Sequence, residues 1–336
     1  MKEINKQKIA YVCRKFLQMI VVLVLLSMAV FVIARLCPGD PLRAYYGDGV
    51  EHMSEMEKDA ARENLGLNDS IVVQYGRWAQ HLAQGDLGLS FKYKQPVSQV
   101  IAGVWINTLV LCGLSYVLTF YLAIALGKFC AFREDSRIDR LICKVGTVST
   151  SIPSFFMALL LILIFSVNLG ILPAGGAYSL GEKNDVLGRI YHLILPVSVL
   201  VLEHLWYYAY MVRNKLLEET RRDYVLLCKA EGIPAGVILG KHCMRNIMPS
   251  MLTVMAISAP HILGGAYVVE MVFSYPGLGT LSFEAAMYQD YNMLMALCLI
   301  TGAVVLVFNL AAQILSMLID PRTRYAEEIT GEEGVG

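Results

Sequence analysis

Residues 218–250 read EETRRDYVLLCKAEGIPAGVILGKHCMRNIMPS, and they form the longest charged stretch between two long apolar runs of the chain. The pattern predicts a short helix from about Asp223 to Glu231, with Asp223 as its N-cap and Gly232 as its stop, just before a proline. A second helix is predicted from Val237 into the next apolar run. On loop geometry alone a solvated connection is favoured over a surface that docks a cytosolic partner.

The composition is too apolar for an ordinary soluble domain. The chain has 336 residues, of which 56% are hydrophobic and 17% charged, with a formal net charge of zero, so nothing indicates nucleic-acid binding. A buried core helix would explain one long apolar run but not six in one chain. We therefore predict an all-α integral membrane protein with six transmembrane helices, at about 16–34, 107–132, 145–169, 190–212, 247–272 and 293–319.

The positions of lysine and arginine predict the orientation of these spans. Positive charge gathers before the first span, after the second, after the fourth and after the sixth. The loop 170–189 holds only Lys183 and Arg189, and the loop 273–292 holds neither residue type. Both termini and the charged loop are therefore predicted to be cytoplasmic, with a large extracytoplasmic loop between spans one and two. The first run is longer than a signal-peptide core, so we interpret it as an uncleaved span.

The eight cysteines show no Cys-x-x-Cys spacing, so the sequence indicates neither a disulfide framework nor a zinc site. The chain also lacks the Gly-x-x-x-x-Gly-Lys-Ser/Thr pattern of a phosphate-binding loop. We predict no catalytic residue, no metal and no cofactor.

The external segment that follows the first span contains local signals for helices. Ser54-x-x-Glu57 is a capping box that predicts a short helix up to about Asn64. Another helix is predicted over 74–84, with Tyr75 and Trp78 on its apolar side. Turns are predicted at Cys37-Pro38-Gly39-Asp40-Pro41 and Gly85-Asp86-Leu87-Gly88-Leu89-Ser90. The segment either caps the outer mouth of the spans or docks an extracytoplasmic protein, and the two roles are compatible.

Four of the ionisable residues inside predicted spans bear on function, because an unpaired charge at mid-bilayer costs about 2.5–3.5 kcal/mol. Glu203 and His204 lie in the middle of span four, His261 lies in the middle of span five, and Glu270 lies near the outer end of span five. They are candidates for a substrate path. Hydrogen bonding between helices is the alternative, and Glu270 has an interfacial position as a further alternative. Prolines are predicted to interrupt spans three to five at Pro153, Pro196, Pro249 and Pro260.

The charged loop resembles the coupling-loop motif of ABC importer permeases, and specifically the branch for dipeptides, oligopeptides and nickel. Leu226-Leu227-Cys228 stand where the general motif has Glu-Ala-Ala, a replacement that this branch tends to make. The matching residues are Asp223, Tyr224, Val225, Lys229, Ala230, Glu231, Gly232, Arg245, Asn246 and Pro249. Further matches follow in family order from about residue 10 to 324, among them Asn107-Thr108, Ser151-Ile152-Pro153, Gly264-Gly265, Pro276-Gly277-Leu278-Gly279 and Asp320-Pro321-Arg322.

The resemblance implies a permease subunit in the cytoplasmic membrane that moves small peptides, nickel or metal chelates. It implies a second related permease, two ABC ATPase subunits that the charged loop contacts, an extracytoplasmic binding protein and membrane lipid as partners. The implied parts are an N-terminal span with its loop domain (1–106), a permease core (107–324) and a tail (325–336). The alternatives are an ion-coupled secondary transporter that uses Glu203, His204 or Glu270 as proton sites, and a membrane scaffold or sensor.

Overall fold

The structure is a computed structural model that describes residues 2–36, 42, 46–64, 68–149, 151–178 and 185–319. The predicted turn at Cys37–Pro41, the Asp320-Pro321-Arg322 match and the tail 325–336 lie outside the described residues. The described part is helical, with one isolated β-bridge between Leu89 and Pro96.

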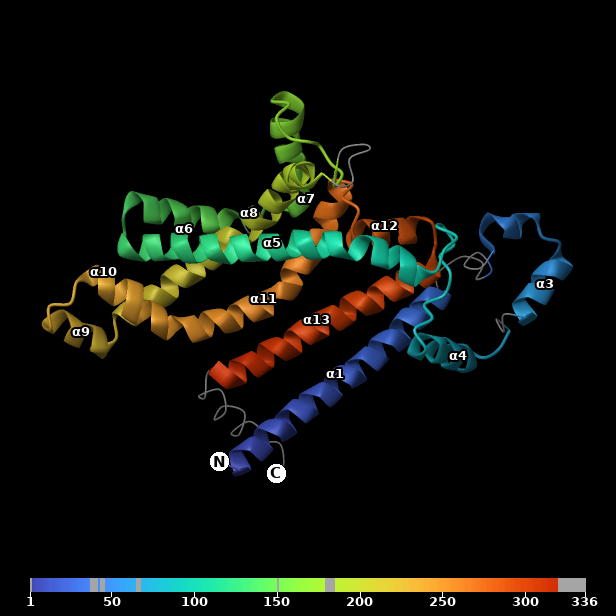
Figure 1. Cartoon of the computed structure of the whole chain (residues 1–336), viewed down its shortest axis with the longest axis horizontal. Coiled ribbons are helices and arrows are strands. Elements are labelled where there is room, and N and C mark those ends of the chain that lie inside the picture. The colour runs from blue at the N-terminus through green and yellow to red at the C-terminus, as the bar shows by residue number, and fades with distance from the viewer. Residues whose placement is uncertain are drawn as a thin grey trace. The chain divides into compact units, whose positions relative to one another are not determined.

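Five helices are long and apolar enough to cross a membrane, and a sixth span exists if one bent pair of helices is counted together. The helices are drawn in Figure 1. Those of the five spans are α1 (Lys2–Leu36), α5 (Val97–Phe132), α8 (Val186–Thr220), α11 (Met244–Val272) and α13 (Tyr291–Ile319). The shorter elements are η1 (Gly47–His52), α3 (Glu55–Asn64), α4 (Ile71–Ala83), α6 (Arg137–Ser149), α7 (Ser154–Leu161), η2 (Ile162–Asn168), α9 (Asp223–Ala230), α10 (Ala235–Val237), η3 (Ile238–Cys243) and α12 (Leu278–Met287).

The predicted third span, 145–169, is broken at Pro153 as predicted and does not form a single helix. The sequence there forms α6 and then α7 with the π-helical η2, and the two parts meet at 111°. Pro153 is the N-cap of α7 and has extended backbone angles. Because proline lacks an N–H group and keeps its preceding residue out of the helical region, the chain restarts at this residue instead of bending through it.

The other three prolines were also predicted to interrupt their spans, but they do not. Pro196 lies inside α8, and Pro249 and Pro260 lie inside α11. Neighbouring helices in a membrane protein can satisfy the carbonyl groups that a proline leaves without a donor. The helical stretch that contains α11 begins at Ala235, two residues before the predicted start at Val237, and runs unbroken to Val272.

The chain divides into two compact units, of which unit 2 comprises Leu109–Tyr275 and Phe308–Gly336. Within unit 2, α8 packs against α6, α7 and α11. The helix α5 approaches α8 closely, because a Cβ atom on Gly127 would lie 2.6 Å from the carbonyl oxygen of Ala209. The opposite face of α5 exposes large side chains such as Leu114, Val117 and Tyr121. Such a face is suited to lipid.

Unit 1 comprises Met1–Thr108 and Pro276–Val307. The predicted helix over 74–84 is α4, and its Tyr75 and Trp78 rings pack 5.6 and 5.4 Å from the ring of Phe31 on α1. The predicted capping box is confirmed at the start of α3: the Ser54 N–H donates to Glu57 Oε2 at 2.8 Å, and the Glu57 N–H donates to Ser54 Oγ at 3.3 Å. The capping bonds lower the pKa of Glu57.

The helix α12 lies in the segment 273–292, which the sequence analysis treated as a loop, and side chains pin the helix at both ends. The Leu278 N–H donates to Thr108 Oγ1 at 2.8 Å. Beyond the other end, the buried carboxylate of Asp290 accepts from Ser90 Oγ at 2.5 Å and from the Lys92 and Met293 N–H groups, both at 3.2 Å. The predicted turn that ends at Ser90 is thereby fixed against the start of α13. The division at residues 106 and 324 stays a prediction.

Candidate functional site

The helix α9 is the predicted short helix of the charged loop, and its two ends explain why it stops where it does. Its N-cap is Arg222, so the prediction that Asp223 caps the helix is wrong; Asp223 is the first helical residue, where a carboxylate suits the helix dipole. At the other end Gly232 has a φ of +77°, the left-handed backbone that glycine adopts without strain. The Gly232 N–H donates to the Lys229 carbonyl and the Ile233 N–H to the Cys228 carbonyl, both at 3.0 Å, which completes a Schellman motif.

One face of α9 is buried against other helices of unit 2. Val225 is 1% exposed and packs in a cluster with residues of α8, η3 and α11, which are Val212, Leu216, Leu217, Ile238, Leu239, Cys243, Ile247 and Met251. The Tyr224 hydroxyl donates to Cys243 Sγ at 3.5 Å. Burial, followed by this hydrogen bond, raises the pKa of Tyr224. Tyr224 and Val225 therefore hold α9 in place and do not face outward.

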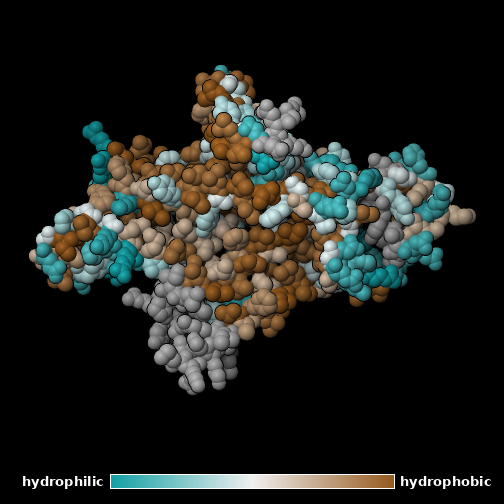
Figure 2. Space-filling view, viewed as in Figure 1, coloured by the Kyte–Doolittle hydropathy of each residue, from teal (hydrophilic) through white to brown (hydrophobic). Residues whose placement is uncertain are grey.

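The other face of α9 projects into solvent and carries two leucines. Leu226 is 63% exposed and Leu227 is 60% exposed, and Asp223 and Lys229 are exposed on the same short helix. Figure 2 shows apolar atoms among hydrophilic ones at this end of unit 2. Large apolar side chains raised on a polar loop are typical of an interaction surface. The exposure of these leucines was not predicted, although an apolar pair within a charged stretch was the available signal.

From the last residue of α9 onward, some of the predicted coupling residues are exposed, and one of them holds neighbouring helices together. Ala230, Glu231 and Gly232 are exposed, and so is Arg245 near the start of α11. The side-chain amide of Asn246 donates to Glu219 Oε1 at 3.1 Å, which ties the start of α11 to the end of α8. Asn246 thus fixes the two helices between which α9 is held.

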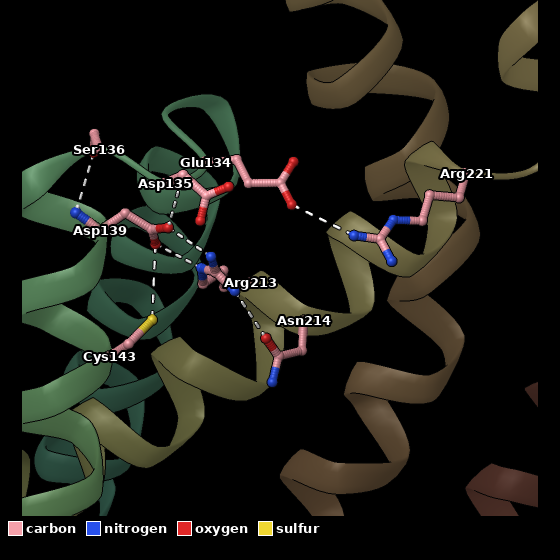
Figure 3. Close-up of polar contacts among 8 residues, drawn as sticks. All are labelled: Glu134, Asp135, Ser136, Asp139, Cys143, Arg213, Asn214 and Arg221. Atoms are coloured by element: carbon pink, nitrogen blue, oxygen red, sulfur yellow. Dashed lines mark hydrogen bonds and ion pairs between the residues drawn. The ribbon is translucent and has the colours of Figure 1, made fainter.

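A buried ion pair fixes the C-terminal part of α8, which precedes α9 (Figure 3). Arg213 on α8 donates from Nε and Nη2 to the two carboxylate oxygens of Asp139 on α6, each at 2.5 Å. The Asp139 side chain is 1% exposed and that of Arg213 is 14% exposed. The same carboxylate accepts from the Asp135 N–H at 3.0 Å and from Cys143 Sγ at 3.8 Å. This planar two-bond geometry is the strong form of an arginine–carboxylate contact.

A second, exposed pair links the same two regions. Arg221 Nη2, at the end of α8, lies 3.6 Å from Glu134 Oε1 in the turn between α5 and α6, and both side chains are well exposed (Figure 3). An exposed pair of this kind contributes about 0–1 kcal/mol. The buried pair with Arg213, 74 residues from its partner in sequence, is therefore the principal polar connection between α6 and α8. From the sequence, Arg213 is only one of the positive charges that follow the fourth predicted span.

The four membrane-embedded candidates have different environments. Glu203 and His204 are partly buried on α8, Glu270 is fully buried on α11, and His261 is exposed on α11. Within residues 2–36, 42, 46–64, 68–149, 151–178 and 185–319, no group of three or more histidine, cysteine or acidic side chains is placed to hold a metal ion.

Comparison with known proteins identifies the family. Residues 123–325, more than half of the chain, match the family described as binding-protein-dependent transport system inner membrane component. The chain belongs to this family. Residues 8–112 match the N-terminal component of the same transport systems. The protein is therefore a permease subunit of an ABC importer of the peptide family, not an enzyme, and a multi-pass protein of the cytoplasmic membrane.

Full-length relatives and solved structures agree with this membership. The permease is 35% identical over 317 residues to the oligopeptide transport system permease protein AppB of Bacillus subtilis, covering 94% of this chain and 99% of the relative. It is 32% identical over 335 residues to the dipeptide transport system permease protein DppB of Alkalihalophilus pseudofirmus, covering 94% and 100%. A chain of the inward-facing MetNI methionine ABC transporter has a similar fold, with a TM-score of 0.54 at 16% identity over 66% of this chain and 97% of that chain.

Proposed function

We propose that this permease carries small peptides across the cytoplasmic membrane as half of a permease heterodimer, and that α9 couples it to an ATPase subunit. The observation that carries the coupling proposal is the helix α9 itself, which presents Leu226 and Leu227 to solvent while Val225 anchors it in unit 2. Peptides are proposed as substrate because the relatives above are named for oligopeptide and dipeptide transport. An extracytoplasmic binding protein delivers the substrate, and two ATPase subunits hydrolyse ATP.

The coupling residues divide into two groups under this proposal. Asp223, Lys229, Ala230 and Glu231 are exposed beside the two leucines and contact the ATPase, and exposed Arg245 lies at the edge of the same surface. The second group holds the helix in position by its packing, its hydrogen bonds and its backbone geometry, and consists of Tyr224, Val225, Gly232 and Asn246.

Uptake by the reconstituted importer tests the function and separates the substrate classes. The permease is placed in lipid vesicles with its partner permease, ATPase subunits and binding protein, and uptake of a radiolabelled tripeptide and of a nickel chelate is measured with and without ATP. We expect ATP-dependent uptake of the tripeptide. Uptake of the nickel chelate alone would assign the chain to metal transport. Uptake that follows a proton gradient without ATP would instead support an ion-coupled secondary transporter that uses Glu203, His204 or Glu270.

The orientation in the membrane gives a prediction that can be checked on intact cells. A cysteine at Met56, which is 84% exposed on α3, is expected to react with an impermeant maleimide added from outside. A cysteine at Leu226 is expected to react only after the membrane is opened, because α9 faces the cytoplasm in this proposal. The unsubstituted chain measures the background from native cysteines such as Cys13. Labelling of position 226 from outside would reverse the orientation and remove the coupling role of α9.

The end of α9 gives a second prediction. Gly232→Val is expected to reduce ATP-dependent uptake strongly while the amount of permease in the membrane stays near normal. A Cβ atom at this position would meet no atom within 4 Å, so the expected effect comes mainly from the left-handed backbone, which costs a non-glycine residue about 1–2 kcal/mol. Gly232→Asn is the matched control, because asparagine tolerates this conformation. Equal uptake by the two variants would mean that the geometry of this helix end is unimportant.

A further inference from the structure

A carboxylate on α8 lies over a glycine of α11 in the interior of unit 2. A Cβ atom on Gly265 would lie 3.3 Å from Glu203 Oε2, 3.4 Å from Leu200 Cδ2 and 3.7 Å from His204 Cε1. A Cβ atom on the preceding Gly264 would meet nothing within 4 Å. Gly265 therefore lets Glu203 and His204 pack closely against α11, while the adjacent Gly264 borders open space, and we call these four residues the Glu203 site.

Glu203 has an acceptor that nothing in the described part of the chain uses. Its Oε2 atom is buried and has no hydrogen-bond partner there, and no ion pair to Glu203 is formed among those residues. A carboxylate inside a membrane span is costly unless it faces a cavity or meets a partner of opposite charge. Because no described residue supplies that charge, a cation of the substrate or of another subunit is a suitable partner for Glu203.

His204 adds a second acceptor to the Glu203 site. Its Nδ1 atom lies 3.0 Å from the Leu200 carbonyl oxygen, which can only accept, so Nδ1 carries the hydrogen. In the neutral ring Nε2 is then an acceptor. The ring stacks on Tyr208 at an interplanar angle of 8°, which fixes its orientation. Two acceptors, one of them negatively charged, complement a group with several N–H donors and a positive charge.

We propose that the Glu203 site binds the primary ammonium group of a peptide in transit, with Glu203 as the counter-charge and His204 as a second acceptor. The inference rests on the proposed function, because it names the part of the peptide that the permease holds. An amino terminus and a lysine side chain both supply this group. A cation of the second permease is the competing partner for Glu203.

Chemical modification of a cysteine at Gly264 tests this proposal in the purified complex of both permeases and the ATPase subunits. The binding protein is left out, so that it cannot select among the peptides. The rates of modification by aminoethyl and by sulfonatoethyl methanethiosulfonate are measured by mass spectrometry of the fragment that contains residue 264, which leaves the native cysteines in place. Glu203→Gln is expected to lower the ratio of the cationic to the anionic rate by roughly tenfold, because it removes the nearby negative charge.

Protection by peptides identifies the bound group. Trialanine at millimolar concentration is expected to slow the modification, while its analogue without the amino group is not. The protection should vanish with Glu203→Gln and persist in part with Glu203→Asp. An N-acetylated peptide that contains lysine shows whether a side-chain ammonium is also bound: protection by it extends the site to both sources, and its absence restricts the site to the amino terminus.

Three results would overturn the proposal: equal protection by trialanine and its desamino analogue, protection that is unchanged by Glu203→Gln, or no modification of the cysteine by either reagent. Loss of the second permease from the Glu203→Gln complex during size-exclusion chromatography would assign the cation to that subunit and would also overturn it. ATP-dependent uptake of trialanine by the unsubstituted importer separates failure of this inference from failure of the proposed function. If uptake occurs without protection, only this inference fails; if uptake is absent, the proposed function fails.

Discussion

Arg213→Met is expected to lower the free energy of unfolding by about 3–5 kcal/mol, because it leaves a buried carboxylate without its charged partner. Asp139 is 1% exposed, and the contacts that remain to it, from the Asp135 N–H and the Cys143 thiol, are uncharged. Methionine keeps an apolar stem of similar length, so the loss of the charge is the main change. Thermal unfolding of the purified permease in detergent measures the effect.

Two further variants separate the contribution of the ion pair to stability from that of the surrounding contacts. Replacing both partners, Asp139→Leu with Arg213→Met, is expected to recover most of the lost stability, because a buried ion pair can often be replaced by apolar side chains without loss. Arg221→Met breaks the exposed contact with Glu134 and is expected to cost less than about 1 kcal/mol. If Arg213→Met proves no more harmful than Arg221→Met, the buried pair does not support the packing of α6 against α8.

Replacing Leu226 and Leu227 together by aspartate is expected to reduce ATP-dependent uptake more than a hundredfold while the permease stays folded in the membrane. Burial of a leucine side chain in a partner contributes about 1.5–3 kcal/mol, so losing two exceeds the roughly 2.7 kcal/mol that a hundredfold change in affinity represents. Both side chains are at least 60% exposed in the permease, so their replacement leaves its own packing intact. Co-purification of the ATPase subunits with the variant measures the binding directly.

The same short helix provides the controls. Leu226→Met with Leu227→Met keeps the apolar surface and is expected to retain uptake. Val225 is adjacent to Leu226 in sequence, but its side chain packs in the buried cluster of unit 2. Val225→Asp is therefore expected to destabilise the permease and lower its amount in the membrane. Normal uptake by the double aspartate variant would show that α9 does not couple transport to ATP hydrolysis through its exposed leucines.

Features that depend on a few neighbouring residues were predictable from the sequence. The capping box at Ser54 and Glu57 and the left-handed Gly232 each need only a short window of sequence, and the structure has both. Long apolar runs predicted six spans, and five of them are helices long and apolar enough to cross a membrane, because a span requires about twenty apolar residues whatever the tertiary contacts. The family motif located α9 but did not distinguish its buried face from its exposed one.

Features that depend on distant contacts were not predictable. Nothing near Asp139 or Arg213 in sequence indicates that the two side chains meet, since 74 residues separate them. Pro153 and Pro196 are the same residue type in two apolar runs, yet one begins a new helix and the other lies inside α8. Local sequence cannot decide between these outcomes, because neighbouring helices determine whether the freed backbone groups are satisfied. The helix α12 was missed because its segment begins with a turn-rich sequence that masks the helical residues after it.

The helical stretch that begins at Ala235 contains a π-helical segment between α9 and α11. Its residues Ile238–Cys243 form the π-helical η3, in which each hydrogen bond spans one residue more than in an α-helix. A local return to α-helical geometry would shift the register by one residue and turn the segment before it by about 100° about the helix axis. Under the proposed coupling role, a displacement of α9 would reach α11 as a rotation about the helix axis and would not require α11 to slide. Amide hydrogen exchange across residues 238–243, compared with and without the bound ATPase, would register such a turn, and identical exchange in both states would speak against it.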